Sequence, residues 1–213
     1  MSVAVKICGL NDAAAGAAAV EGRADFVGFV FFPASPRFVE PETAARLGAS
    51  VPKTIIKVGL VMDADDATLG QIVAEAKVDM LQLHGEESPA RAAEIRARFR
   101  LPVMKALLVA TAADVDKARD FEPAVDRLMF DARPPKDATR PGGNALPFDW
   151  TLLKGHAFAK PWLLAGGLSA ANVAEAVRAS GARAVDVSSG VEMAPGRKSS
   201  EKILEFLRVA TTL

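Results

Sequence analysis

Short apolar runs and longer alanine-rich stretches alternate along the whole chain. The short runs are rich in Val, Ile, Leu and Phe, which is typical of strands buried on both faces of a parallel sheet. The longer stretches carry charges at helical spacing. We predict strands at Val3–Ile7, Phe26–Phe31, Ile55–Val61, Met80–Leu83, Val103–Leu107, Arg127–Phe130, Trp162–Leu164 and Ala184–Val187. We predict helices at Asn11–Glu21, Glu42–Gly48, Asp65–Ala76, Ser88–Arg98, Ala113–Arg119, Asp149–Lys154, Ala171–Ala179 and Ser200–Val209.

This alternation predicts an α/β fold with the strands and helices paired in order. No linker or low-complexity tract divides residues 1–213, so we expect a single domain. Eight strand–helix pairs in a chain of this length favour a single-domain (β/α)8 TIM barrel. The alternative is an open doubly wound sheet, which commonly carries G-x-G-x-x-G after its first strand. The first strand here ends in Ile7-Cys8-Gly9-Leu10, which does not match.

An aspartate follows a small or apolar residue where a helix hands over to a strand. The four instances are Asp25, Asp79, Asp126 and Asp186. Because they occupy equivalent places, we expect them to share a role in turn chemistry or at the strand entry.

The composition narrows the class of protein. The chain has 26 Lys plus Arg and 26 Asp plus Glu, so its formal net charge is zero. That balance argues against nucleic acid or an anionic membrane as partner. No apolar run approaches the ~20 residues of a membrane span, and the start lacks signal-peptide features, so we expect a soluble, cytoplasmic protein. The single cysteine, Cys8, excludes an intrachain disulfide.

In a barrel of this kind, reactive groups come from the carboxyl ends of the strands and the loops beyond them. Few polar residues stand at those positions. They are Cys8, Arg37, Asp63, Gln82, His84, Asp131, Arg133, Gly166-Gly167 and Ser188-Ser189-Gly190.

The loops after the last two strands predict a phosphate site. Gly166 and Gly167 let backbone N–H groups approach an anion closely. Ser188, Ser189 and Gly190 supply hydroxyl and amide donors one unit later. A helix N-terminus adds to the attraction. Such a site needs no lysine, so zero net charge does not oppose it. The simpler interpretation is that the glycines only turn a tight corner.

Cys8 and Asp131 are the candidate reactive groups. A free cysteine is most often a small buried hydrophobe, but Cys8 ends a strand and shares a face with Lys6. Nearby amides and a helix N-terminus would stabilise a thiolate, which could serve as nucleophile or general base. Asp131 ends an apolar strand, where it could be a metal ligand, a general acid or a loop cap.

Arg37 and His84 have weaker signals. Arg37 follows Ser35-Pro36 in a stiff loop, and its planar fork suits a carboxylate, although a solvated arginine fits equally well. His84 could be a general base or a metal ligand. The sequence contains no H-x-H or H-E-x-x-H pattern, so a zinc site is disfavoured.

A series of short segments points to one family in order along nearly the whole chain. The segments are Val5–Leu10, Gly28–Phe31, Ser35–Arg37, Val58–Val61, Leu81–Gly85, Phe130-Asp131, Phe148–Trp150, Leu164–Leu168, Asp186–Glu192 and Pro195–Lys198. With them the chain resembles phosphoribosylanthranilate isomerase, an enzyme family of tryptophan biosynthesis in which K-I-C-G, Q-L-H-G and S-S-G-V-E recur together.

The resemblance implies an Amadori rearrangement of a phosphoribosyl aminoaldose to an aminoketose. Cys8 matches the family's general base and Asp131 its general acid. Arg37 would hold the substrate carboxylate, and the two loops described above would hold its phosphate. His84 and Gln82 are possible substrate contacts. The resemblance implies no cofactor and no metal; the partner is a small phosphosugar, and the enzyme would be a monomer or homodimer.

The chain departs from the family's sequence pattern at two places, and two alternative functions stay open. The family often has G-G-T-G where this chain has Gly142-Gly143-Asn144-Ala145, and often has Asp where this chain has Ser199.

The first alternative function is that of another phosphosugar barrel enzyme. A metal-dependent pentose-phosphate epimerase would want paired His and Asp ligands, whereas a two-carboxylate sugar isomerase would have Asp in place of Cys8. The second is a non-catalytic barrel that only binds a phosphate ligand.

Overall fold

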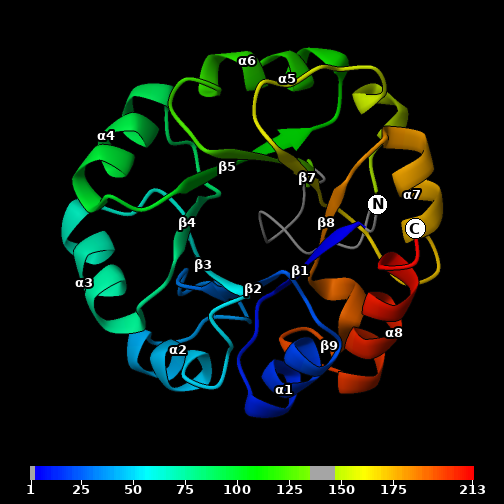
Figure 1. Ribbon diagram of the computed structural model, residues 1–213. Helices are drawn as coiled ribbons and strands as arrows, with labels where there is room; N and C mark the ends of the chain where they lie inside the picture. The colour runs from blue at the N-terminus through cyan, green and yellow to red at the C-terminus, as the bar shows by residue number, and fades with distance from the viewer. Residues whose placement is uncertain (1–2, 135–146) are drawn as a thin grey trace.

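The computed structural model describes residues 3–134 and 147–213. Parallel strands close into a barrel in chain order from β1 to β8, with the helices outside it (Figure 1). The predicted TIM barrel is therefore confirmed, and the open sheet is wrong. The strands are β1 (Ala4–Cys8), β2 (Phe26–Val30), β3 (Ile56–Val61), β4 (Met80–Leu83), β5 (Val103–Val109), β6 (Arg127–Ala132), β7 (Trp162–Leu164) and β8 (Ala184–Val187).

The helices cover the barrel because each has an apolar face that needs burial. Several begin at a side-chain cap: Asp12, Asp65, Ser88 and Ser199 each accept a hydrogen bond from a backbone amide of the first turn. The helices are α1 (Ala13–Glu21), α2 (Pro41–Gly48), α3 (Asp66–Ala76), α4 (Pro89–Phe99), α5 (Ala112–Asp116), α6 (Ala118–Phe121), α7 (Val173–Ser180) and α8 (Ser200–Ala210). Among the described residues, none of these helices combines the length and apolar character that crossing a membrane requires.

Three segments differ from the sequence prediction. The helix predicted at Ala113–Arg119 is divided into α5 and α6 at Lys117. The helix predicted at Asp149–Lys154 is a short 3-10 turn, η1 (Trp150–Leu153), which ends before Gly155 with its φ of 81°. After β8 the chain forms a second 3-10 turn, η2 (Ser189–Val191), and then an unpredicted hairpin.

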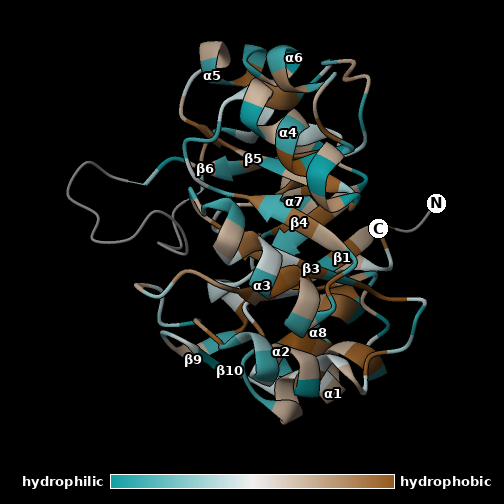
Figure 2. Cartoon of the chain, turned by 90° about the vertical axis from the view of Figure 1, so that its left-hand side faces the viewer, coloured by the Kyte–Doolittle hydropathy of each residue, from teal (hydrophilic) through white to brown (hydrophobic). Residues whose placement is uncertain are grey.

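The hairpin consists of β9 (Glu192–Ala194) and β10 (Arg197–Lys198). Its turn contains Gly196, whose φ of 76° lies in the left-handed region that favours glycine. The hairpin lies at the end of the barrel towards which the strands point, on the opposite side from the start of the chain (Figure 2). The sequence showed only Pro195-Gly196 as a loop, because two strands this short carry no periodic signal.

The barrel interior has its own apolar core, separate from the layer between strands and helices. Alternate residues of each strand point inward. The inner core contains Phe26, Val58, Met80, Met104, Ala106, Met129, Leu163, Ala165 and Ala184. Gln82 and Asp131 lie two residues after Met80 and Met129 on the same strands, so they also point inward. Strand alternation therefore places polar side chains in the mouth of the barrel.

Three of the four repeated aspartates share a role at the opposite end of the barrel. Asp25, Asp79 and Asp126 each accept a hydrogen bond, through Oδ2, from the amide that enters the preceding strand, at 2.8 to 2.9 Å. Each residue's own amide donates back to the same strand. The expectation was wrong for Asp186, because β8 begins at Ala184 and places Asp186 inside the barrel, where it pairs with Lys6.

Candidate active site

The candidate residues gather at the carboxyl end of the barrel. Cys8 is the last residue of β1, and Asp131 is the last but one of β6. His84 and Ser188 come directly after β4 and β8. Strand alternation from the inner core turns all four towards the barrel axis. The structure therefore brings the sequence-predicted groups from strands far apart in the chain to one mouth.

Asp131 is held by its own backbone and lies beside a histidine. Its Oδ1 accepts a hydrogen bond from the amide of Ala132 at 2.8 Å, and its Oδ2 lies 3.3 Å from Nε2 of His84. The side-chain amide nitrogen of Gln82 lies 3.0 Å from Nδ1 of His84 on the other side of the ring. The carboxyl group of Asp131 and the ring of His84 therefore lie next to each other in the barrel mouth.

Cys8 lies above a buried ion pair. Nζ of Lys6, which is fully buried, is 2.8 Å from Oδ1 of Asp186. A Cβ on Gly28 would lie 3.0 Å from Nζ of Lys6 and 3.1 Å from Sγ of Cys8, so both atoms rest against the same bare backbone of β2. A larger residue at this position would press on both atoms.

Opposing effects act on the pKa of the Cys8 thiol. Burial raises the pKa of Cys8 above its ordinary value, and the Asp186 carboxylate adds to this, while the Lys6 and Lys198 ammonium groups act against it. Burial alone would lower the pKa of Lys6, but Asp186 and Cys8 together outweigh it, and the net direction is upward. Lys6 therefore stays charged beneath a cysteine whose thiol form predominates at neutral pH.

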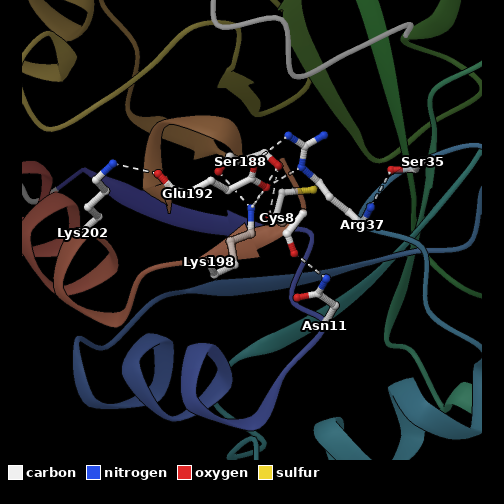
Figure 3. Close-up of polar contacts among 9 residues, drawn as sticks. Cys8, Asn11, Ser35, Arg37, Ser188, Glu192, Lys198 and Lys202 are labelled. Carbon is white, nitrogen blue, oxygen red and sulfur yellow. Dashed lines mark hydrogen bonds and ion pairs between the residues drawn. The ribbon is translucent and has the colours of Figure 1, made fainter. Parts of the chain in front are cut away.

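Arg37 is not the solvated arginine that its loop position allowed. It is 6% exposed and forms a two-pronged ion pair with Glu192, with Nε to Oε1 at 2.7 Å and Nη2 to Oε2 at 2.9 Å. Nζ of Lys198 lies 2.9 Å from Oε1 of Glu192 and donates to the carbonyl of Ser188. Figure 3 shows these groups converging beside Cys8.

The two loops predicted to hold phosphate lie against each other. Gly166 and Gly167 have φ of 86° and 67°. A Cβ on Gly190 would collide with the carbonyl oxygen of Leu168, so the loop after β8 packs directly on the loop after β7. Asn172, just before α7, accepts from the amide of Ser169 and donates to the carbonyl of Gly167, which fixes the first loop. The glycines therefore serve close backbone approach as well as turning.

Sequence reasoning did not place four buried charges at this site. They are Lys6, Asp186, Glu192 and Lys198. A usable signal existed for Lys6, because a charged residue inside an otherwise apolar strand must find a buried partner. The pairing of Glu192 with Arg37 joins residues 155 positions apart, and no local pattern encodes it.

The two departures from the family pattern have different outcomes. Gly142-Gly143-Asn144-Ala145 lies outside the described residues, as do Pro135 and Pro141. Ser199 precedes α8 and accepts a hydrogen bond from the amide of Lys202 at 3.3 Å, so serine itself supplies a helix cap. Across residues 3–134 and 147–213, His, Cys, Asp and Glu side chains form no group of three that could hold a metal ion.

The fold and the site define a class, a TIM barrel with ionisable groups and glycine-rich loops at its carboxyl mouth. Residues 5–209 match the family model described as N-(5′-phosphoribosyl)anthranilate (PRA) isomerase. The isomerase of Paramagnetospirillum magneticum with that name is 56% identical over 210 residues, covering 99% of this chain and 98% of its own. The chain belongs to the N-(5′-phosphoribosyl)anthranilate isomerase family.

Solved structures agree with this assignment. The crystal structure of phosphoribosyl anthranilate isomerase from Thermotoga maritima has a TM-score of 0.89 and 33% identity, and covers 99% of this chain and 100% of that one. A second isomerase crystal structure, in complex with reduced 1-(o-carboxyphenylamino)-1-deoxyribulose 5-phosphate, has a TM-score of 0.86 and 32% identity over the same shares of the two chains.

Proposed function

We propose that the protein isomerises N-(5′-phosphoribosyl)anthranilate to 1-(2-carboxyphenylamino)-1-deoxyribulose 5-phosphate, an Amadori rearrangement in tryptophan biosynthesis. The observation that carries the proposal is the pair of inward-facing groups at the barrel mouth, the Cys8 thiol on β1 and the Asp131 carboxyl on β6. In the closed strand order these two strands are separated by β7 and β8, so a sugar between them has a proton donor on one side and an acceptor on the other.

The first step opens the furanose ring. Asp131 donates its proton to the ring oxygen, the C1′–O bond breaks, and the nitrogen lone pair forms a C1′=N double bond. The Ala132 amide holds one oxygen of the carboxyl group, and the His84 ring lies beside the other. Proton transfer by a positioned group contributes typically about 10²–10⁴-fold.

The second step removes the C2′ proton. The Cys8 thiolate takes this proton, the C2′–H electron pair forms a C1′=C2′ double bond, and the C1′=N electrons return to nitrogen. The enolamine then becomes the ketone by gaining a proton at C1′ and losing one from the 2′-hydroxyl. Lys6 and Lys198 favour the thiolate that this step requires, whereas burial opposes it.

The charged ends of the substrate would be held apart from the reacting carbons. Arg37 would receive the anthranilate carboxylate, and the loops containing Gly166, Gly167, Ser188, Ser189 and Gly190 would receive the phosphate. The reaction moves protons and double bonds within one molecule. It therefore needs no oxidant, reductant or other cofactor.

The test is a turnover assay that follows the fall in anthranilate-type fluorescence after addition of freshly made substrate. We expect full conversion with an unchanged rate in EDTA. A parallel titration with reduced 1-(o-carboxyphenylamino)-1-deoxyribulose 5-phosphate measures binding. A folded protein that binds this ligand without turning over substrate would be a non-catalytic binding barrel, and the proposal would fail.

A further inference from the structure

The β9–β10 hairpin contacts both anion-holding parts of the proposed site. Within it, Glu192 forms the two-pronged pair with Arg37, and Lys198 bridges Glu192 to the loop of Ser188. The turn also touches the loop that carries Arg37, because a Cβ on Gly196 would collide with the carbonyl oxygen of Pro36. The side-chain amide of Asn11 donates to the carbonyl of Gly196 at 2.8 Å and ties the turn to the segment after β1 (Figure 3).

The pairing leaves one defined edge of Arg37 for a ligand. Glu192 takes hydrogens from Nε and Nη2, on one side of the planar guanidinium. The Nη1 hydrogens and the second Nη2 hydrogen form the other edge of the fork, which matches the two oxygens of a carboxylate. The stem of Arg37 is confined as well, because a Cβ on Gly9 would lie only 2.6 Å from its Cδ.

Lys198 contacts the same carboxylate as Arg37. Its buried side-chain nitrogen lies 2.9 Å from Oε1 of Glu192. Burial lowers the pKa of Lys198 below its ordinary value, while Glu192 acts against that shift. Burial raises the pKa of Glu192, but Arg37 and Lys198 outweigh it and hold that pKa below its ordinary value, so the carboxylate stays ionised. The ionised Glu192 thus holds Arg37 and Lys198 together beside the loop of Ser188.

We propose that Glu192 is a positioning residue that presents the free edge of Arg37 to the carboxylate of the substrate, and that it thereby determines specificity for a carboxylate-bearing phosphosugar. The inference rests on the proposed function. Glu192 itself touches no reacting atom; it acts through the guanidinium. Its loss should therefore weaken recognition of the carboxylate while leaving recognition of the phosphate unchanged.

The experiment compares two ligands on two proteins. One ligand is reduced 1-(o-carboxyphenylamino)-1-deoxyribulose 5-phosphate, and the other is its phenylamino counterpart without the carboxylate. Calorimetric titration gives Kd for the wild type and for Glu192→Gln. We expect the variant to bind the first ligand about tenfold or more weakly. The reason is that Arg37 is no longer held in the geometry of its charge-assisted contact with the ligand carboxylate. Binding of the second ligand should be the same as in the wild type. In steady state the variant should raise KM and leave kcat nearly unchanged.

Two further variants separate positioning from general damage. Lys202→Met removes a bond to the backbone carbonyl of Glu192, at 2.7 Å, without touching the carboxylate, and should leave both Kd values unchanged. If Glu192→Gln fails to fold, Glu192→Asp keeps the charge with a shorter reach and should show the same selective loss.

Equal weakening of both ligands in the Glu192 variants, or a selective loss in Lys202→Met equal to that of Glu192→Gln, would overturn the inference. Failure of the proposed function would look different. In that case the wild type itself would neither turn over substrate nor distinguish the two ligands.

Discussion

The two ends of the barrel use the same amino acid for different purposes. At the end where the strands begin, Asp25, Asp79 and Asp126 accept hydrogen bonds from backbone amides of neighbouring strands. At the end where the strands finish, Asp131 accepts a hydrogen bond from one backbone amide through Oδ1, and its Oδ2 faces His84. Each carboxylate of the first group is used to fix a strand entry. Asp131 keeps an oxygen that faces another ionisable side chain in the barrel mouth.

The difference shows why composition alone does not locate chemistry in this fold. A carboxylate that closes a strand entry contributes stability, whereas one carried inward at the carboxyl end can exchange a proton with a ligand. The contrast leads to two opposite expectations for the two ends of the barrel. Substitutions at the mouth should change rates more than stability, and substitutions at the entry should do the reverse.

The largest effect is expected for Asp131→Asn. Asparagine keeps an acceptor oxygen for the Ala132 amide but cannot donate a carboxyl proton to the ring oxygen. We expect kcat to fall by about 10²–10⁴-fold with the melting temperature nearly unchanged. Steady-state fluorescence kinetics and thermal denaturation check the two halves. Wild-type turnover by a folded Asp131→Asn protein would remove the carboxyl group from the mechanism.

Cys8→Ser should lower kcat about as much as Asp131→Asn, by roughly 10²–10⁴-fold, because a serine hydroxyl is a far poorer source of an anionic base.

The activity of the wild type should depend on pH in a predictable way. The pKa of Cys8 is raised, so the thiolate fraction grows as pH rises above neutrality. We expect kcat/KM and the rate of thiol alkylation by iodoacetamide to rise together over this range. A plateau already reached below pH 7 would contradict a buried thiol as base.

A smaller effect concerns Asp114, which tests stability near the mouth without touching the proposed chemistry. Burial raises the pKa of Asp114, but hydrogen bonds from Ala110, Lys117 and Thr111 outweigh it and hold it at about 2. A folded-state pKa below the ordinary value gives stability that is present above about pH 4 and lost as pH falls through 2. Asp114→Asn should lose about 2 kcal/mol at pH 7.

The check on Asp114 is urea denaturation of both proteins at several pH values. The two unfolding free energies should converge near pH 2. A difference that stays constant down to pH 2 would mean that the Asp114 carboxylate is not the stabilising group.

The smallest effect is expected at the strand entry. Asp126→Ala removes the acceptor for the amide of Val103, and should lower the unfolding free energy by about 1 kcal/mol with kcat unchanged. Urea denaturation and the fluorescence assay measure both quantities on one preparation. A rate loss comparable to that of Asp131→Asn would erase the distinction between the two ends.

The sequence predicted the barrel because each strand and helix carries a local signal. Apolar runs marked the strands, and Ser88 or Asp65 marked helix starts. It also placed Cys8 and Asp131 at the correct end, since strand order determines which residues share an edge. The failures within the site have one cause. The Arg37–Glu192 pair and the position of Asp186 depend on contacts between distant segments, which no local pattern encodes.

The hairpin was missed, and η1 was predicted as a longer helix, for a second reason. Segments of two to four residues are too short to show a period, so their type and bounds could not be predicted from the sequence.

In the proposed mechanism, Cys8 and Asp131 divide two proton transfers between them. The most direct measurement is a single-turnover fluorescence trace with substrate deuterated at C2′, recorded for the wild type, Asp131→Asn and Cys8→Ser. We predict that deuterium slows the wild type. We also predict that Asp131→Asn is limited before C–H cleavage and shows little isotope effect, and that Cys8→Ser gives almost no product. A Cys8→Ser protein that turns over at the wild-type rate with the wild-type isotope effect would contradict the account.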